Sequence, residues 1–293
     1  MGRGDLTNRE WSLLEPHLPS PGGRGGRWND HRTVLNGILL RVRTGVPWRD
    51  LPERYGSWKT VYERHRRWSA DGTWDRLLQA VQADADLAGW IDWSMVGVDS
   101  TSCRAHQHAA GARKAKPRVP KRGTTPRHHR PDEGLGRSRG GLTSKIHLAG
   151  EGGCRPMALL ITPGQWGDAP QMIEVLDRIR VPRPLVGRPR TRPDHVSGDK
   201  AYSSRRNRRY LRRRRIKHTI PEPKDQRANR RRRGSAGGRP AGFDRERYRR
   251  RNEVERTINR LKNSRAVATR YDKRAYVFHG TVTAAAVRLW LRP

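Results

Sequence analysis

The sequence has few cysteines, few acidic residues and no long apolar run. Its only two cysteines, Cys103 and Cys154, exclude a disulfide framework as the organising device of the fold. No signal peptide is recognisable, and no run reaches the roughly 18 apolar residues that a membrane-spanning helix needs. We therefore expect a cytoplasmic protein.

The scarcity of acidic residues leaves a strong positive charge. The chain has 28 Asp and Glu against 64 Lys and Arg, which gives a formal net charge of +36. A polyanion is the expected partner at that charge, and nucleic acid is the first candidate. Of the basic residues 54 are Arg, which suits bidentate phosphate contact, although a GC-rich genome produces the same bias.

Apolar residues are also few, at 33%, but they are clustered. Eight of the ten tryptophans lie between Trp11 and Trp93, and short runs of Val, Ile and Leu recur later. An even spread at this level would indicate disorder. The clustering instead predicts packed cores that are separated by basic loops rich in Gly and Pro.

The first 90 residues are predicted to form a small all-α region. The apolar period predicts helices over residues 6–14, 30–42, 57–68 and 72–86. The third of these carries Lys59, Arg66 and Arg67 on its polar face. This pattern resembles a helix-turn-helix unit with residues 57–68 as the recognition helix on DNA. The alternative is a helical bundle whose polar face contacts only water.

From residue 94 the pattern changes to short apolar strands. Met95 to Val98 is followed by Asp99, and His195 to Gly198 is followed by Asp199. An acid at the carboxyl end of a strand lies where an open α/β sheet presents its site. An Asp before Ser and Thr also suits the start of a turn. Further strands are predicted over residues 142–148, 157–162 and 216–220.

Trp166 lies in a Gly-rich loop after the predicted hairpin over residues 142–162. Asp168 follows as the expected cap of the next helix. An aromatic side chain in such a loop can stack on an unpaired base. The alternative is that Trp166 packs against the sheet.

Two basic segments, residues 104–140 and 221–243, are predicted to be flexible loops. The first contains side chains that invite a zinc interpretation, but no second cysteine pair stands at finger spacing. A mobile basic loop beside nucleic acid is the better interpretation. The candidate zinc ligands are Cys103, His106, His108, His128 and His129.

Residues 244–263 are predicted to form an amphipathic helix capped by Asp244. Its apolar stripe is Val254, Ile258 and Leu261, and a second stripe beside it contains Tyr248, Arg251, Glu255 and Lys262. Glu253 points about 200° away from Glu255, so it is not the acid of this stripe. Taken alone, Arg251 and Glu255 could be an exposed ion pair worth a few tenths of a kcal/mol.

The predicted element order places three acids on one α/β fold. The predicted order is ribonuclease H-like. It runs from a strand ending at Asp99 through a hairpin and a helix to a strand ending at Asp199, and then through a helix and strand to a late helix with Glu255. That fold makes the two acid-bearing strands neighbours and packs the late helix against them. Carboxylates brought so close repel unless a cation joins them, and ligands that are all oxygen suit Mg²⁺ or Mn²⁺. Two such ions can clamp the attacking and leaving oxygens of a phosphoryl displacement.

Several motifs carry a resemblance to a known family. The late helix fits the spacing Tyr-x2-Arg-x3-Glu-x6-Lys, Gly198 to Tyr202 fits Gly-Asp-x-x-Tyr, and Asp99 stands before Ser and Thr. Trp48 to Trp58 is similar to the amino-terminal domain of the same family. The chain thus resembles, over nearly its whole length, the DDE transposases of the IS-five-like bacterial insertion sequences, within the IS-four and IS-five superfamily.

The resemblance implies a helical DNA-binding domain over residues 1–90 and a ribonuclease H-like catalytic domain over residues 91–293. It implies binding to terminal inverted repeats, metal-dependent hydrolysis at each end, and attack of the freed 3′-hydroxyl on target DNA. Asp99, Asp199 and Glu255 would be catalytic and would hold Mg²⁺ or Mn²⁺, as two ions. The partner would be double-stranded DNA of the element ends and the target, bound by a homodimer or larger assembly at the nucleoid. The residues expected to contact DNA are Tyr248, Arg251, Lys262, Tyr202, Lys200, Lys59, Arg66, Arg67 and Trp166.

Two other functions remain open on the sequence. The first is a non-catalytic, sequence-specific DNA-binding protein, either a decayed transposase or a regulator, which would need neither a divalent metal nor Glu255. The second is an RNA-processing nuclease with the same catalytic fold, which would prefer RNA to duplex DNA.

Overall fold

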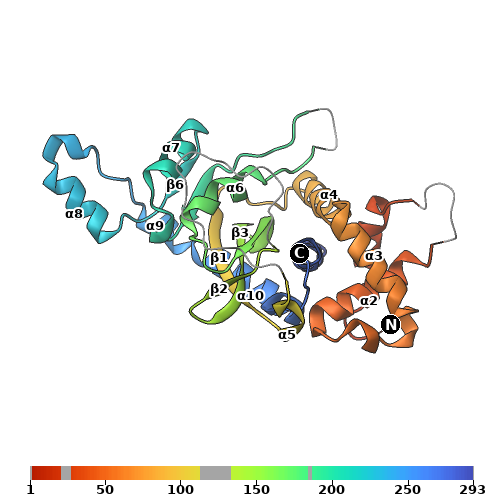
Figure 1. The fold of residues 1–293 in the computed structure, drawn as a ribbon. Coiled ribbons are helices and arrows are strands. Elements are labelled where there is room, and N and C mark those ends of the chain that lie inside the picture. Colours follow the sequence, from red (N-terminus) through yellow and green to blue (C-terminus); the bar gives the residue numbers. More distant parts are fainter. Residues whose placement is uncertain (1, 21–27, 113–132, 184–186, 293) are drawn as a thin grey trace.

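A mixed sheet lies at the centre of the molecule, with the amino-terminal helices to one side and the exposed helix α8 (Lys224–Arg232) to the other (Figure 1). The computed structural model describes residues 2–20, 28–112, 133–183 and 187–292. No helix of this described part is long and apolar enough to cross a membrane.

The amino-terminal helices start and end at clear sequence signals. Thr7 and Glu10 form a capping box at the start of the first helix, and Asp30 accepts a hydrogen bond from the Thr33 N–H at the start of the second. The second helix ends at Gly45, whose φ of 70° is in the left-handed region that glycine adopts without strain. The helices are α1 (Asn8–Leu14), α2 (His31–Thr44), α3 (Trp58–Ala70) and α4 (Thr73–Leu87), close to the predicted bounds.

The sheet has the strand order β2-β3-β1-β5-β6, with β4 beside β3 and β7 beside β1. β1 is antiparallel to β3 and parallel to β5, and the parallel pairing places Val98 opposite Gly198. This is the ribonuclease H-like order that the sequence predicted, including the hairpin of β3 and β4. The bounds are β1 (Val96–Ala105), β2 (Gly136–Ser138), β3 (Gly141–Glu151), β4 (Arg155–Pro163), β5 (His195–Gly198), β6 (Lys217–Thr219) and β7 (Thr269–Arg270).

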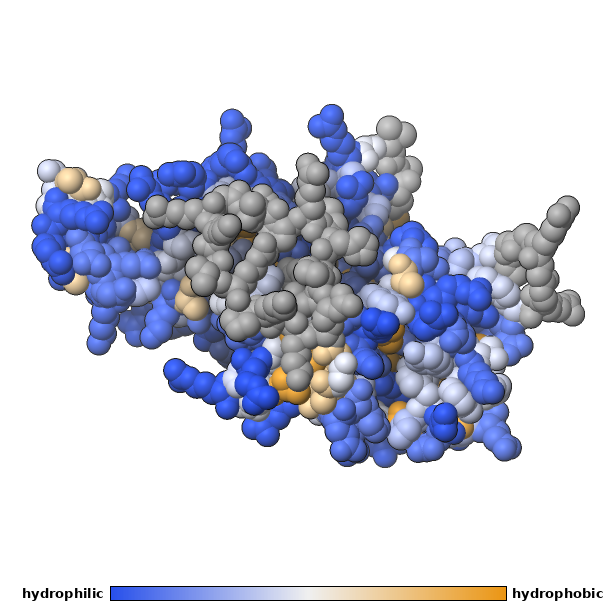
Figure 2. All heavy atoms as spheres, in the orientation of Figure 1, coloured by the Kyte–Doolittle hydropathy of each residue, from blue (hydrophilic) through white to orange (hydrophobic). Residues whose placement is uncertain are grey.

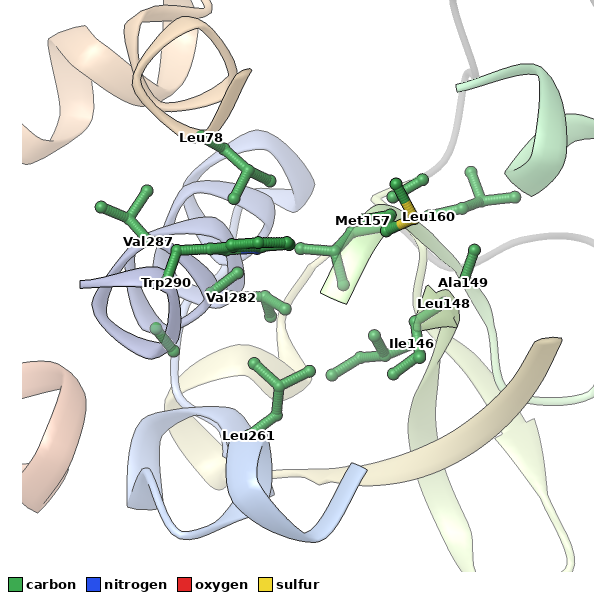
Figure 3. Packing of buried hydrophobic residues seen from close by; sticks show 14 of the residues in the cluster. Leu78, Ile146, Leu148, Ala149, Met157, Leu160, Leu261, Val282, Val287 and Trp290 are labelled. Atoms are coloured by element: carbon green, nitrogen blue, oxygen red, sulfur yellow. The ribbon is translucent and has the colours of Figure 1, made fainter. Parts of the chain in front are cut away.

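Helices pack on both faces of the sheet. Lys145 of β3 reaches Asp168 at the start of the α6 region, while the neighbouring Ile146 and Leu148 point toward Leu261 of α10 (Figure 3). Alternate residues of a strand face opposite sides, so α6 and α10 cover opposite faces. The remaining helices are α5 (Gln107–Ala110), α6 (Met172–Asp177), α7 (Arg205–Arg213), α9 (Arg245–Arg249), α10 (Asn252–Lys262), α11 (Arg265–Ala268) and α12 (Ala275–Trp290).

The helix α12 packs between the amino-terminal helices and the sheet. Its apolar side chains meet Leu78 of α4 on one side and Met157 and Leu160 of β4 on the other (Figure 3). The Trp290 indole N–H donates to the Pro156 carbonyl at 2.8 Å. Buried apolar residues from the helices and from the sheet therefore form one continuous core. The division into domains at residue 90 stays a prediction.

Two segments predicted as loops contain regular structure. Within residues 104–140, β1 continues to Ala105, and α5 and β2 follow; residues 113–132 lie outside the described part. Within residues 221–243, α8 forms after Pro223, because Lys224–Arg232 contains no Gly or Pro and Arg and Lys are good helix formers. The prediction was wrong because it gave charge more weight than helix propensity.

The predicted single helix over residues 244–263 is divided into α9 and α10. Asp244 caps α9 as expected, through the Arg247 N–H. Around Arg250 and Arg251 the backbone N–H groups bond three residues back, as in a tighter turn. The Arg250 guanidinium binds Asp92 at 2.5 Å, a partner far away in sequence that a helical period cannot reveal.

Candidate active site

Two aspartates lie where two adjacent parallel strands stop pairing. The pairing of β1 and β5 ends at Val98 and Gly198, so Asp99 and Asp199 come next on each strand. The Asp99 carboxylate accepts a hydrogen bond from the Ser100 N–H, and the Asp199 carboxylate accepts one from the Ala201 N–H, both at 2.8 Å. The prediction that the first strand ends at Asp99 was wrong, because β1 continues beyond it, paired with β3.

Glu255 comes from α10, which two glycines allow to lie close to the sheet. A Cβ atom at Gly97 of β1 would lie 2.6 Å from the Val254 Cβ, closer than real Cβ contacts allow. A Cβ atom at Gly150 of β3 would lie 2.9 Å from the Thr257 Oγ1. The residues on either side of Glu255 along the helix are therefore fixed against both strands, and Glu255 is fixed with them.

The carboxylates of these acids influence one another. The pKa of Asp99 is raised above its ordinary value of 3.8, mainly by burial and further by the negative charges of Asp199 and Glu255, while Arg251 acts in the opposite direction. Arg251 forms an ion pair with Glu255 at 2.6 Å. The fold thus concentrates negative charge around Asp99, and the Ser100 N–H and the Arg251 guanidinium partly offset it.

A group of carboxylates that raises the pKa of one of its members suits a hard divalent cation, because the donors are all oxygen. Within the described residues, however, no three His, Cys, Asp or Glu side chains lie close enough together to hold a metal ion. Glu255 is turned to Arg251, so a cation shared by the acids requires that this ion pair open. Of the proposed zinc ligands, His128 and His129 lie outside the described part.

The other residues of the late helix motif lie along one line beside Glu255. The Arg251 guanidinium lies 5.6 Å from the centre of the Tyr248 ring, on α9. At the other end of α10, the Lys262 Nζ donates to the Thr101 Oγ1 at 3.2 Å, two residues beyond Asp99 on β1. The structure therefore brings Tyr248, Arg251 and Lys262 to the same side as Asp99 and Glu255.

The remaining residues expected to contact DNA lie in three environments. Tyr202 is buried, and burial with the nearby charges of Asp99, Asp168 and Asp199 raises its pKa well above 10.0. Lys200 is exposed beside Asp199, and Trp166 is half-buried in the turn after β4. Lys59, Arg66 and Arg67 are exposed on α3, which α12 separates from the sheet (Figure 1).

Sequence reasoning missed Asp168 and Lys145 as residues of this region. Asp168 was expected to cap a helix, but its side chain makes no cap; it accepts hydrogen bonds from the Ser100 Oγ at 2.7 Å and the Lys145 Nζ at 2.9 Å. The available signal was a charged side chain, Lys145, within a predicted strand. The cap of the following basic helix, α7, is Ser204.

Cationic side chains dominate the surface beyond the acids. Figure 2 shows hydrophilic side chains over the region of α7 and α8. An open groove between α6 and α7 is lined by Ile173, Arg205, Arg206, Arg209, Tyr210 and Arg213. Such a row of arginines on one helix suits contact with phosphate.

The strand order and the acids at its centre define a ribonuclease H-like protein of the DDE class. Residues 90–290 match the family model of the "Transposase DDE domain", and residues 6–78 match that of the "Putative transposase of IS4/5 family". The chain belongs to the DDE transposases of the IS4/5 type.

Relatives from two bacteria agree with this assignment. An uncharacterised protein, y4sN of Sinorhizobium fredii, is 42% identical over 113 residues, which cover 38% of this chain and 85% of that protein. An uncharacterised 16.2 kDa protein of insertion element IS402 of Burkholderia cepacia is 40% identical over 36% of this chain and 76% of that protein. The "Putative transposase for insertion sequence element IS402" of the same organism is 32% identical over 47% of this chain and 57% of its own length. The Mos1 transposase paired-end complex matches with a TM-score of 0.27 and 11% identity over 84% of this chain and 82% of that chain, which is too little likeness to support an argument.

Proposed function

We propose that this transposase binds the terminal inverted repeats of its own insertion sequence and catalyses DNA cleavage and strand transfer there. The observation that carries the proposal is the placement of Asp99 and Asp199 just after the parallel pairing of β1 and β5 ends, with α10, which carries Glu255, packed against β1 and β3. We assign these acids as the catalytic residues and as the ligands of Mg²⁺ or Mn²⁺, in two ions. When bound, such ions clamp the attacking and leaving oxygens of an in-line displacement.

The proposed reaction has two balanced steps. In the first, a water oxygen bonds to the phosphorus at the element end as the bond from phosphorus to the 3′-oxygen breaks, which frees a 3′-hydroxyl. In the second, that hydroxyl attacks a phosphodiester of the target, and one phosphorus–oxygen bond forms as another breaks. Neither step needs a covalent enzyme–DNA intermediate or a further energy source.

Residues around the acids supply contacts to the DNA in this proposal. Arg251 and Lys262 flank Glu255 and would contact the phosphates next to the scissile bond. Tyr248 and Tyr202 would position the neighbouring groups. Lys200 and Trp166 would contact the DNA beside the acids, and Lys59, Arg66 and Arg67 would contact it through α3.

The partner in this proposal is duplex DNA, of both the element ends and the target. The net charge of +36 supports that choice. Coordinated cutting of two ends requires at least a dimer on the DNA. A nucleoid location follows from the same binding.

The test is metal-dependent cleavage of a supercoiled plasmid that carries this gene with its native flanking DNA. With Mg²⁺ or Mn²⁺, purified protein should cut at the boundaries of an inverted repeat. Asp99→Ala, Asp199→Ala and Glu255→Ala should each lower the cleavage rate at least a thousandfold, on the order expected when residues that act as a unit are removed, while binding of the ends persists. Appreciable cleavage by any of the three variants would contradict the assignment.

A matched control is available on the same helix. Glu253 lies two residues from Glu255 but pairs with Arg250 at 2.7 Å. Glu253→Gln should therefore keep cleavage. Binding at the boundaries without cleavage under any metal would instead support the non-catalytic DNA-binding protein, and a preference for RNA would support the nuclease.

A further inference from the structure

Asp168 joins the start of the α6 region to two strands of the sheet. Its Oδ1 accepts hydrogen bonds from the Ser100 Oγ of β1 at 2.7 Å and from the Lys145 Nζ of β3 at 2.9 Å. Lys145 is held in turn by the Trp166 carbonyl at 3.0 Å. His147, buried in β3, places its Nδ1 3.7 Å from the same carboxylate oxygen. Side chains of β1 and β3 thus converge on one carboxylate.

This arrangement is not a helix cap. Asp168 stands immediately before the short 3-10 helix η4 (Ala169–Gln171), where an Asp side chain normally binds a free backbone N–H. Its side chain makes no such bond, although a cap is worth about 1 kcal/mol. The carboxylate is instead turned toward the strands, and a role there explains why the cap is absent.

Ser100 connects Asp168 to the first acid. The Ser100 N–H donates to the Asp99 Oδ1 at 2.8 Å, and the Ser100 Oγ donates to the Asp168 Oδ1. One residue therefore holds Asp99 through its backbone and is itself held by Asp168 through its side chain. A displacement of the Ser100 backbone would therefore move the hydrogen bond that orients the Asp99 carboxylate.

The Tyr202 side chain lies beside Ser100 as well. Tyr202 is 1% exposed, and both the Ser100 side chain and the charges of Asp99, Asp168 and Asp199 act on the pKa of its hydroxyl. Ser100 therefore stands among the acids and a buried phenol.

We propose that Asp168, held by Lys145, is a positioning residue that fixes the Asp99 carboxylate through Ser100. Asp168 is a poor ligand itself, because the ammonium group of Lys145 engages its carboxylate oxygen. Among the residues that the structure describes, no Lys or Arg side chain forms an ion pair with Asp99, although Arg251 is near enough to act on its pKa. The proposal rests on the proposed function, since it takes Asp99 as a metal ligand.

The test measures metal binding without DNA, so that it does not depend on cleavage. Mn²⁺ is titrated into full-length wild type, Asp168→Asn and Lys145→Met, and free Mn²⁺ is followed by electron paramagnetic resonance. Loss of a residue that orients a metal ligand typically weakens binding about 10–100-fold, and we expect both variants to fall in that range. Cleavage at saturating DNA should slow by a similar factor, with the affinity for the element ends unchanged.

The control is Glu174→Gln on the neighbouring α6. Glu174 pairs with Arg178 at 3.0 Å, so this variant also removes an ion pair beside the sheet, but one without a link to Ser100. It should bind Mn²⁺ as the wild type does. If Asp168→Asn fails to fold, Ser100→Ala carries the test, because it removes the link and leaves the Asp168–Lys145 pair in place.

The outcomes separate the two proposals. Wild-type Mn²⁺ affinity in Asp168→Asn, or in Ser100→Ala where the first does not fold, would overturn the positioning role if Asp99→Ala loses affinity in the same assay. Wild-type affinity in Asp99→Ala would overturn the proposed function instead. Weaker Mn²⁺ binding in Asp168→Asn and Ser100→Ala, with an unchanged thermal midpoint and normal Glu174→Gln, supports the positioning role.

Discussion

At the scale of single residues, the candidate site brings negative charges together, and their repulsion lowers the stability of the folded protein. Burial and the charges of Asp199 and Glu255 raise the pKa of Asp99 above 3.8. A carboxyl group with a higher pKa in the folded than in the unfolded state binds more protons when folded. Its ionisation therefore lowers the free energy of unfolding as pH rises from 3.8 through the folded pKa.

Asp99→Asn should for this reason stabilise the metal-free protein at neutral pH while it abolishes cleavage. Urea unfolding in the presence of a chelator should give the variant a higher midpoint than the wild type at pH 7. The difference should vanish well below pH 3.8, where the wild-type carboxyl is protonated in both states. A variant less stable than the wild type at pH 7 would show that Asp99 is not under electrostatic strain.

Local sequence patterns indicated the three acids but not the contacts of Asp168 and Lys145. Asp99 and Asp199 each follow a short run predicted as a strand, and Glu255 lies on a helical stripe. Asp168 and Lys145 meet only through the pairing of β1 with β3 and the path of the chain after β4. No spacing in the sequence encodes that meeting, and Asp168 was interpreted as an ordinary cap.

At the scale of elements, the distance between α10 and the sheet decides where Glu255 lies. Gly97 has no side chain at the point where Val254, 1% exposed, packs on β1. Gly150 plays the same part on β3 for Thr257. The helix is thus closer to the strands than any larger residue would permit, and a change of one methyl group should move it.

Gly97→Ala should lower the free energy of unfolding by about 1–3 kcal/mol, the usual effect of overpacking, and should slow cleavage strongly. The double variant Gly97→Ala, Val254→Gly should recover part of the cleavage rate, because it removes the Val254 Cβ and Cγ1 atoms that a Cβ atom at Gly97 would meet at 2.6 and 2.9 Å. Gly242→Ala is the control, since a Cβ atom there meets nothing within 4 Å. Equal cleavage by Gly97→Ala and the wild type would mean that the close approach is unimportant.

The neighbouring positions of β1 and β5 were predictable, because the order of the predicted strands and helices fits a ribonuclease H-like arrangement. The break between α9 and α10 was not, because Arg250 leaves the helical path to bind Asp92 and Ser94 on the segment before β1. Helix α8 was missed for a different reason. Its residues are almost all exposed, so it has no apolar period to detect.

At the scale of the whole molecule, buried polar side chains join the amino-terminal helices to the carboxyl-terminal segment. His65 of α3 is completely buried; its Nε2 lies 3.1 Å from the Thr281 Oγ1 of α12, and its Nδ1 accepts from the Trp74 indole N–H at 3.2 Å. Asp272, also buried, binds Arg41 of α2 at 3.0 Å and Thr281 at 2.8 Å. The apolar residues of α12 are evident in the sequence, but the elements that it packs against are not.

The free energy of unfolding should fall on mild acidification because of His65. Burial lowers the pKa of His65 from 6.5 to about 4. Between these pH values the unfolded chain therefore binds a proton at His65 that the folded chain does not bind. The contribution of neutral His65 to the free energy of unfolding is complete above pH 6.5. It is lost as the pH falls toward 4, by about 1.4 kcal/mol per pH unit. His65→Gln should reduce the slope of the free energy of unfolding against pH by about one proton in this window.

Urea unfolding of the wild type and His65→Gln at several pH values checks this prediction. The difference between the proteins at pH 7, where the histidine is neutral in both states, measures the packing change alone. If plots of the free energy of unfolding against pH were parallel for the two proteins between pH 6.5 and 4, His65 would not take up a proton on unfolding.

The position of α12 also governs the order in which a newly made chain can fold. The helices α3 and α4 leave the ribosome long before α12, which covers their inner face. At about 5–20 residues per second, Ala275 follows Leu87 by roughly 10–40 s. During that interval the nascent chain carries an apolar surface without its partner, so chaperone supply and translation speed set how much of the protein escapes aggregation.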